Sequence, residues 1–314
     1  MEKQLSVSIS PHIHDGSSTR RIMLDVIIAL LPASFVSIWL FGMRALILLT
    51  GSIAAAVLAE MVSRKLMKRD TDSIYDLTAV ITGLLLALSL PSTLPLWQAM
   101  VGSAIAIVIV KQFFGGVGQN FVNPAIAGRL VLVFAYPAAM AAGWVQPLAH
   151  GVDAVSTATP LALVAEGAYA YLPSNMDLFL GIHAGSLGET SILALLIGGL
   201  YLVIRKVISP VIPLAFIGTT LLMVLLAGGD VLVHLLSGSL VIVAIFMATD
   251  YATSPLNFKG RVIFGIGCGF ITAVIRLWGA LPEGVSFAVI IMNILVPHIE
   301  ALTMPKAFGG SKNG

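Results

Sequence analysis

This chain has very little cysteine and very little charge. It contains a single cysteine, Cys268, among 314 residues. One thiol excludes an internal disulfide framework, and it excludes any four-thiolate zinc or iron–sulfur site built by this chain alone. Charged residues make up 10% of the sequence and hydrophobic residues 58%, with a mean hydropathy of +1.00. Water cannot cover a surface of that composition, so the sequence predicts an integral membrane protein, and the net charge of +2 gives no reason to expect a nucleic-acid partner.

The apolar segments predict an all-α integral membrane protein with about ten transmembrane helices, because a membrane-spanning helix needs roughly 20 mostly apolar residues. We place these spans near residues 22–41, 45–62, 74–90, 96–110, 125–142, 190–204, 211–227, 231–248, 262–281 and 285–301. The first apolar run follows Arg20 and Arg21 and is as long as a full span. It therefore predicts a retained helix rather than a cleaved signal peptide.

The distribution of basic residues predicts the orientation. Ten spans put both termini on one side of the membrane, and fifteen of the seventeen Lys and Arg residues fall on or near that side. The positive-inside rule makes that side the cytoplasm of a cell (inner) membrane protein. The longest connection, from about Gly143 to Thr190, carries acidic residues but no Lys or Arg, so we expect it outside. A connection this long is unusual in a compact protein, which makes it a candidate for function.

These features divide the chain into five segments. They are a cytoplasmic N-terminal segment (1–21), a first five-helix half (22–142), an extracytoplasmic loop (143–190), a second five-helix half (191–301) and a cytoplasmic tail (302–314). The second half starts on the opposite side from the first, as in inverted-repeat transporters and channels. Thr93-Leu94-Pro95-Leu96 resembles Thr253-Ser254-Pro255-Leu256 at the corresponding place in the second half, which also favours a five-plus-five repeat.

The outer loop holds the sequence from Asp153 to Leu161, DAVSTATPL, in which Pro160 predicts a helix start with Thr159 as its N-cap. A simple capping role explains the Thr-Pro pair. The same geometry also suits a hydroxyl that carries an esterified phosphate, because free N–H groups at a helix start stabilise that charge. Small neighbours, Ser156 and Ala158, leave room for a modifying enzyme.

Two segments on the cytoplasmic side are candidates for a cofactor wall. Gly115 to Asn123 is rich in glycine and contains Asn120, and it predicts either a re-entrant loop lining a cavity or an ordinary turn. The segment around Asp250 is a similar candidate.

Polar groups within the predicted spans need partners. Arg276 should pair with a carboxylate, a phosphate or helix-end carbonyls, because an unpaired arginine at a helix centre costs roughly 2.5–3.5 kcal/mol. Asp25, which lies one turn from Arg21, and Asp76 are the best carboxylates for an ion path. His234 and His298 are expected to be hydrogen-bonded packing residues rather than metal ligands. The other acidic residues near span ends are Glu60 and Glu300, which we expect to orient the helices.

Several separate segments carry a family resemblance. They are Ser10-Pro11-His12, the segment Gly115 to Ala125 (GGVGQNFVNPA), Ser156 to Leu161, Gly185 to Ser191 (GSLGETS) and Glu283 to Ala288 (EGVSFA). The chain resembles the D-type subunits of the Rnf-type ion-translocating ferredoxin:NAD oxidoreductase complexes and, more distantly, the B-type subunits of the sodium-pumping NADH:quinone oxidoreductases. The resemblance runs nearly end to end.

The resemblance implies a flavin site in the outer loop, with FMN joined through its phosphate to Thr159. Family members usually have glycine where this chain has Thr157, but only Thr159 precedes Pro-Leu. Asp153, Ser156, Thr157 and Ala158 are the expected neighbours of this flavin. The resemblance also implies a second, non-covalent flavin, riboflavin, which we expect near Asn120, Asn123 and Asp250.

The function that the resemblance implies is electron transfer within a redox-driven Na⁺ or H⁺ pump. The partners would be the other Rnf subunits, A, B, C, E and G, including an outer flavoprotein and iron–sulfur subunits, together with membrane lipid and a flavin transferase. The chain has no dinucleotide fingerprint and no cysteine cluster, so NADH and ferredoxin must bind elsewhere, and the chain would be a non-autonomous subunit of an enzyme. The alternatives are a small-solute channel or transporter and a scaffold without electron transfer.

Overall fold

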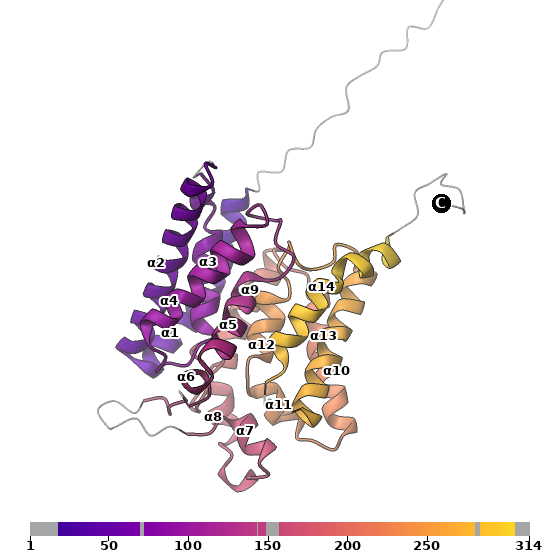
Figure 1. Ribbon diagram of the computed structural model, residues 1–314. Coiled ribbons are helices and arrows are strands. Elements are labelled where there is room, and N and C mark those ends of the chain that lie inside the picture. The colour runs from indigo at the N-terminus through magenta and orange to yellow at the C-terminus, as the bar shows by residue number, and fades with distance from the viewer. Residues whose placement is uncertain (1–17, 70–71, 143, 149–156, 280–282, 305–314) are drawn as a thin grey trace, which may run out of the picture.

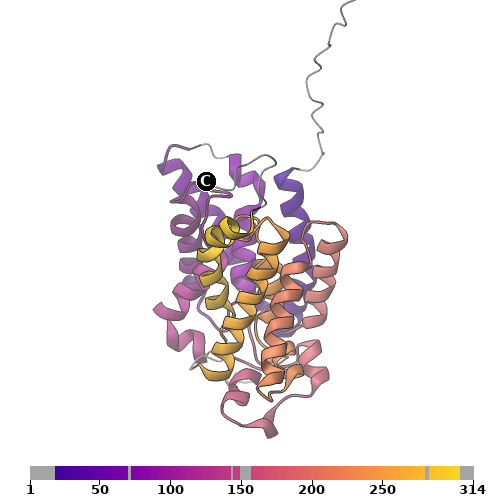
Figure 2. The same cartoon turned by 90° about the vertical axis from the view of Figure 1, so that its right-hand side faces the viewer.

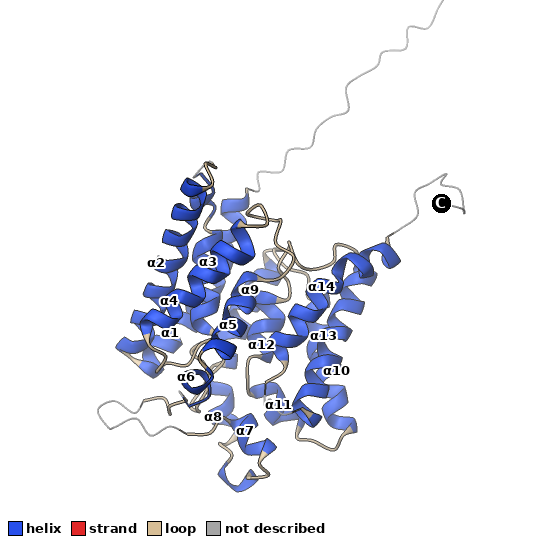
Figure 3. Cartoon of the chain, in the orientation of Figure 1, coloured by secondary structure: helices blue, strands red, loops and turns tan. Residues whose placement is uncertain are grey.

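The computed structural model describes residues 18–69, 72–142, 144–148, 157–279 and 283–304. These residues form helices and loops without a β-strand, apart from one isolated bridge between Pro91 and Ser186 (Figure 3). The all-helical prediction is confirmed for this part of the chain.

Helices of very different lengths build the fold. The first half contains α1 (Thr19–Phe41), α2 (Met43–Leu66), η1 (Asp72–Asp76), α3 (Thr78–Leu88), α4 (Leu96–Ile105), η2 (Ala106–Gln112), α5 (Pro124–Ala135) and α6 (Pro137–Ala142). The middle contains α7 (Pro160–Ala165), η3 (Tyr169–Tyr171) and α8 (Asn175–Leu180). The second half contains α9 (Ile192–Ile204), α10 (Val211–Leu226), α11 (Val231–Leu236), α12 (Leu240–Ile242), η4 (Val243–Met247), α13 (Phe258–Trp278) and α14 (Val285–Thr303).

Four of these helices, α1, α2, α13 and α14, are long and apolar enough to cross a membrane. Five shorter apolar stretches accompany them, in α3, α4 with η2, α5, α9 and α10. The chain is therefore a membrane protein, while the count of ten spans and the inverted repeat stay predictions.

Three predicted spans are not continuous helices. The span predicted at 74–90 begins in the 3₁₀ helix η1 and is interrupted at Leu77, whose φ is 64°, before α3 starts at Thr78. The span predicted at 231–248 stops at Leu236 and resumes at Leu240, because Gly238 has a positive φ of 71° that a helix cannot contain. The span predicted at 125–142 is divided at Tyr136, because Pro137 disfavours helical geometry in the preceding residue. Hydropathy detects apolar length but not such breaks.

Glycines let neighbouring helices approach closely. A Cβ on Gly265 would lie 2.7 Å from the Ala215 Cβ of α10, and one on Gly269 would lie 2.6 Å from the Phe216 carbonyl oxygen. A Cβ on Gly198 of α9 would lie 2.0 Å from the Ala29 carbonyl oxygen of α1. These contacts follow the general use of small residues where membrane helices pack.

The bundle has two opposite ends. Helix α1 begins and α14 ends at one edge, which we call the terminal face, and α7 and α8 lie at the opposite edge, which we call the loop face (Figures 1 and 2). In Figure 1, α1 to α4 form one side of the bundle and α10, α13 and α14 the other, with α5, α9 and α12 between them.

Candidate functional site

Thr159 caps a short helix at the loop face, as its sequence predicts. Its hydroxyl oxygen accepts a hydrogen bond from the Ala162 N–H at 3.3 Å, and Pro160 occupies the first helical position. The neighbouring hydroxyl of Thr157 differs, because its oxygen is buried and has no hydrogen-bond partner within the described residues. Thr159 itself is half-buried and Ala158 is exposed, so the chain is accessible at this point.

A cavity of about 590 Å³ adjoins this segment. Its walls come from Thr157, Ala158 and Pro160 on one side and from Tyr171, Asp177, His183 and neighbouring residues of the outer connection on the other. That volume lies within the 300–1,000 Å³ range of ordinary ligand pockets. Asp153 and Ser156, predicted to lie near the same site, fall outside the described residues. We call this space the outer cavity.

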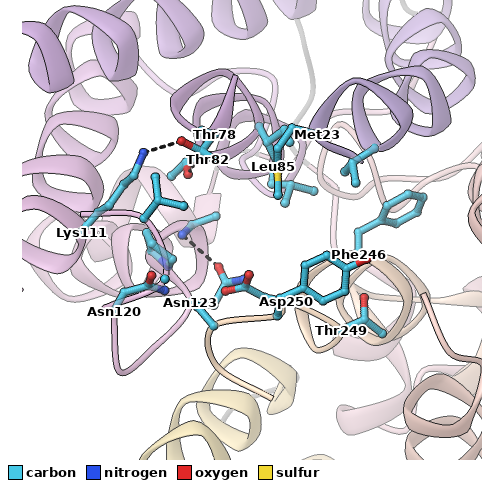
Figure 4. Close-up of a pocket in the computed structure, with 18 of the residues that line it drawn as sticks. Met23, Thr78, Thr82, Leu85, Lys111, Asn120, Asn123, Phe246, Thr249 and Asp250 are labelled. Atoms are coloured by element: carbon cyan, nitrogen blue, oxygen red, sulfur yellow. Dashed lines mark hydrogen bonds between the residues drawn. The ribbon is translucent and has the colours of Figure 1, made fainter. Parts of the chain in front are cut away.

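A second cavity, the inner cavity, lies toward the terminal face and measures about 220 Å³. It brings together Asn120, Asn123 and Asp250, which come from two segments far apart in the sequence. Figure 4 shows these three side chains on one side of the cavity, with Thr78, Thr82, Leu85 and Met23 on the other. Part of the Gly115–Asn123 segment thus contributes to a cavity wall, while Gly115, Gln119 and Phe121 are exposed.

Hydrogen bonds of Asn123 and Asp250 join the segments that line the inner cavity. The Asn123 carboxamide oxygen caps α5 by accepting from the N–H groups of Ala125 and Ile126, and its NH₂ group donates to the Met247 carbonyl at 3.1 Å. Asn123 therefore joins the two segments. The Asp250 carboxyl accepts a hydrogen bond from the Thr253 hydroxyl at 3.1 Å, and burial raises the pKa of this carboxyl.

A buried ion pair on the cavity wall is the main feature that the sequence analysis missed. The Lys111 ammonium donates to a Glu60 carboxylate oxygen at 2.8 Å and to the Thr78 hydroxyl at 2.7 Å, and Gln112 donates to the same Glu60 oxygen at 2.8 Å. Lys111 is 3% exposed and Glu60 is 0% exposed. The positive-inside tally counts Lys111 as an ordinary cytoplasmic charge. The sequence offered one signal for this pair, because Glu60 and Lys111 both lie at the ends of predicted spans.

Other polar residues of the spans have definite partners. Arg276 donates to the carbonyl oxygens of His234, at 2.7 Å, and Ser237, at 3.4 Å, so the predicted pairing with helix-end carbonyls is confirmed at the end of α11. Asp25 accepts from the Tyr201 hydroxyl at 2.8 Å and pairs with Arg205 at 3.2 Å. Its direct partners therefore come from α9 and the residue that follows it, not from the Arg21 turn of its own helix.

The two histidines and the remaining carboxylate of the spans differ in their surroundings. His234 is buried, although its Nδ1 has no hydrogen-bond partner among the described residues, and His298 lies on an exposed face of α14, so the packing prediction is wrong for His298. Glu300 accepts from the Leu256 N–H at 3.0 Å and holds the loop before α13. In the described part of the chain, no group of three or more His, Cys, Asp or Glu side chains is arranged to hold a metal ion.

Comparison with known proteins identifies the family. Residues 6–309 match the model of the NQR2, RnfD, RnfE family. The chain belongs to this family. It is 47% identical over 313 residues to the D subunit of the Na⁺-translocating ferredoxin:NAD⁺ oxidoreductase complex of Acetobacterium woodii, covering 99% of this chain and 97% of that protein.

Two further relatives extend the comparison. The chain is 41% identical to the D subunit of the proton-translocating ferredoxin:NAD⁺ oxidoreductase complex of Clostridium ljungdahlii, covering 97% of this chain and 96% of the relative. It is also 41% identical to the D subunit of the ion-translocating oxidoreductase complex of Stutzerimonas stutzeri, covering 95% of this chain and 94% of that relative. The relatives are named as subunits of complexes, so the activity in their names is that of a complex. Their names include both Na⁺ and H⁺ as the translocated ion.

Proposed function

We propose that this chain is a membrane electron-transfer subunit of a redox-driven ion pump and that it carries FMN in a phosphoester bond to Thr159. The observation that carries the proposal is the position of half-buried Thr159 between Ala158 and Pro160, which both line the outer cavity, combined with family membership along nearly the whole chain. By this proposal the chain acts with the other subunits of an Rnf-type complex in ferredoxin:NAD oxidoreduction. A flavin transferase would attach the FMN from the extracytoplasmic side.

The outer cavity fits a flavin in size and chemistry. Its volume of about 590 Å³ exceeds the lower bound for ligand pockets, and Pro160, Leu163, Tyr171 and Pro173 give it apolar and aromatic walls. The isoalloxazine ring of a flavin supplies one- and two-electron chemistry, while the protein supplies position, dielectric and hydrogen bonds. The Thr157 hydroxyl is a poor acceptor for the FMN phosphate, because its buried oxygen is not accessible to a second enzyme.

The inner cavity is the proposed place for the non-covalent flavin, riboflavin. Its apolar walls and few polar groups, among them Asn120, Asn123 and Asp250, suit a flavin ring in chemistry. Its volume of about 220 Å³ is below the usual range, so the ring would enter only after lining side chains such as Met23 rotate outward. We assign the terminal face to the cytoplasm and the loop face to the outside of the cell membrane, following the distribution of basic residues.

The test is peptide mapping by mass spectrometry on the chain purified from cells that contain its flavin transferase. We expect the peptide bearing Thr159 to carry one FMN less water. Thr159→Ala should remove this addition, and the matched Thr157→Ala variant should retain it. Protein precipitated with acid should keep the FMN in the pellet and release riboflavin into the supernatant.

Two results would contradict parts of this proposal. An unmodified Thr159 peptide in an otherwise active complex would overturn the covalent flavin and favour a channel or a scaffold. A supernatant without flavin would contradict the non-covalent riboflavin alone. The proposed attachment of FMN to Thr159 would still stand.

A further inference from the structure

A buried charge cluster lies behind the outer cavity. Arg129 of α5 donates to Glu283 at 2.5 Å, and Glu283 also accepts from the Ser239 N–H at 3.3 Å and the Ser239 hydroxyl at 3.4 Å. The Glu189 carboxyl lies within hydrogen-bonding reach of Glu283. Arg276 reaches the same place, because a Cβ on Gly238 would lie 2.9 Å from its Nη2 and 3.2 Å from a Glu283 carboxylate oxygen.

Polar atoms in and around this cluster lack partners. Glu189 is 2% exposed, and its Oε1 accepts from the Ser186 N–H at 2.8 Å, but its Oε2 has no hydrogen-bond donor among the described residues. The same holds for a group of equally buried atoms around it, namely Arg129 Nη1, Arg276 Nε, Ser186 Oγ, Ser237 Oγ, His183 Nε2 and His234 Nδ1. Buried polar groups are normally satisfied, so this concentration marks a polar site that water or another small polar group can enter.

The charges of the cluster select the ligand. Two guanidinium groups, Arg129 and Arg276, balance the charge of two carboxylates, Glu189 and Glu283, so the cluster needs neither a metal cation nor an anion to be neutral. Two buried carboxylates in contact repel each other, and one proton converts them into a hydrogen-bonded acid–carboxylate pair. The ligand that fits is a single proton.

His183 connects the cluster to the outer cavity. Its ring lines the cavity, is 2% exposed as a residue, and uses Nδ1 to donate to the Ala184 carbonyl at 3.1 Å. Burial lowers the pKa of His183, against backbone hydrogen bonds at Ala184 and Thr190 that raise it, so the ring is neutral and holds a proton only transiently. Glu189 is adjacent, since a Cβ on Gly185 would lie 3.0 Å from Glu189 Oε1 and 3.5 Å from His183 Cε1.

We propose that Glu189 and Glu283 bind one proton between them and that this proton reaches them from water in the outer cavity by way of His183. Taking up the proton converts the Glu189 carboxylate into the carboxylic acid, and releasing it returns the proton to water. The groups that face the pair are Arg129 from α5, Arg276 from α13, and His183 from the loop that carries Glu189, with His234 behind Arg276.

Electrostatics agrees with the geometry. Burial, with the neighbouring Glu283 carboxylate, raises the pKa of Glu189 to about 8. For Glu283 the two arginines, Arg129 first, outweigh burial and hold the pKa below its usual range. Because the folded chain binds this proton more tightly than the unfolded chain, the proton stabilises the fold at low pH. That stabilisation is lost as the pH rises from about 4.5 to about 8.

Infrared difference spectroscopy on the full-length chain in lipid nanodiscs tests the proposal. We expect the C=O stretching band of a protonated carboxylic acid that disappears with a midpoint near pH 8. Glu189→Gln should remove the band, and the matched Glu166→Gln variant, which changes an exposed carboxylate of the same outer connection, should retain it. Glu283→Gln should lower the midpoint, because the repelling carboxylate is gone while both arginines remain.

Further variants separate a bound proton from a bound cation and test its route. His183→Phe should slow the deuterium exchange of the band, and an unchanged rate would overturn the route through His183. A band that persists in Glu189→Gln would overturn the site, as would an unchanged midpoint in Glu283→Gln. A midpoint that falls with rising Na⁺ would show a cation site instead. Thr159→Ala should leave the titration in place, so failure of the flavin proposal is distinguishable from failure of this one.

Discussion

Removing one partner of the Lys111–Glu60 pair is a direct test of the inner cavity wall. Lys111→Met keeps an unbranched side chain of similar length but removes the ammonium that donates to Glu60 at 2.8 Å. Glu60 would then be a carboxylate at 0% exposure that keeps the Gln112 carboxamide as a donor but has lost the Lys111 ammonium. Breaking a buried pair in this way costs about 3–5 kcal/mol of folding free energy.

A double variant that removes both charges should recover most of the lost folding free energy. Glu60→Gln combined with Lys111→Met contains no charge at this position, so most of the lost stability should return, because replacing both partners of a buried pair is often close to neutral. The interaction energy from the double-mutant cycle should therefore be several kcal/mol. Arg205→Met is the matched control, since Arg205 forms the Asp25 ion pair with a side chain that is 42% exposed. Arg205→Met should lower the folding free energy much less than Lys111→Met, because water screens an exposed ion pair.

The assay is reversible unfolding in mixed detergent micelles, followed by circular dichroism as the share of denaturing detergent rises. The reasoning would be refuted if Lys111→Met cost no more than Arg205→Met. It would also be refuted if the double variant were as unstable as Lys111→Met. Because Lys111 lines the inner cavity, the same samples should show whether non-covalent flavin is lost together with stability.

Two further predictions concern helix packing and use the same unfolding assay. Gly198→Ala should destabilise the fold by roughly 1–3 kcal/mol, because its Cβ would lie 2.0 Å from the Ala29 carbonyl oxygen and α9 would have to move away from α1. Gly218→Ala, where a new Cβ meets nothing within 4 Å, should instead stabilise α10 by up to about 1 kcal/mol, and a loss equal to that of Gly198→Ala would contradict the packing argument. Asn293→Leu should cost roughly 1–3 kcal/mol or more, because it removes the donor at 2.8 Å to the Thr253 carbonyl and the acceptor of the Asn123 N–H. An unchanged midpoint would show that this link is not formed.

Local features of the fold could be predicted from the sequence where one residue type dictates geometry. Thr159-Pro160 predicts a capped helix start, and the structure has one, because proline fixes φ and threonine supplies the capping oxygen. Gly265 and Gly269 of α13 contact α10 closely, as small residues do where membrane helices pack. The break at Gly238 was not predicted, because a glycine inside an apolar run is compatible with a helix until the surrounding packing determines its φ.

The sequence by itself determined that this is a helical membrane chain, which family it belongs to, and which threonine is the candidate for flavin attachment. Composition and short motifs carry that information, because hydrophobic length and capping act over a few adjacent residues. The resemblance grouped Asn120, Asn123 and Asp250, and the tertiary structure showed the cavity that all three line. The tertiary structure also decided that Lys111 pairs with Glu60, and that Glu189 and Glu283 lie close together near Arg129 and Arg276. The two members of each pair, Lys111–Glu60 and Glu189–Glu283, are 51 or more positions apart, and the charge of a side chain does not reveal its partner. Burial selects the partner, since a charge removed from water is stable only where the fold supplies a compensating group.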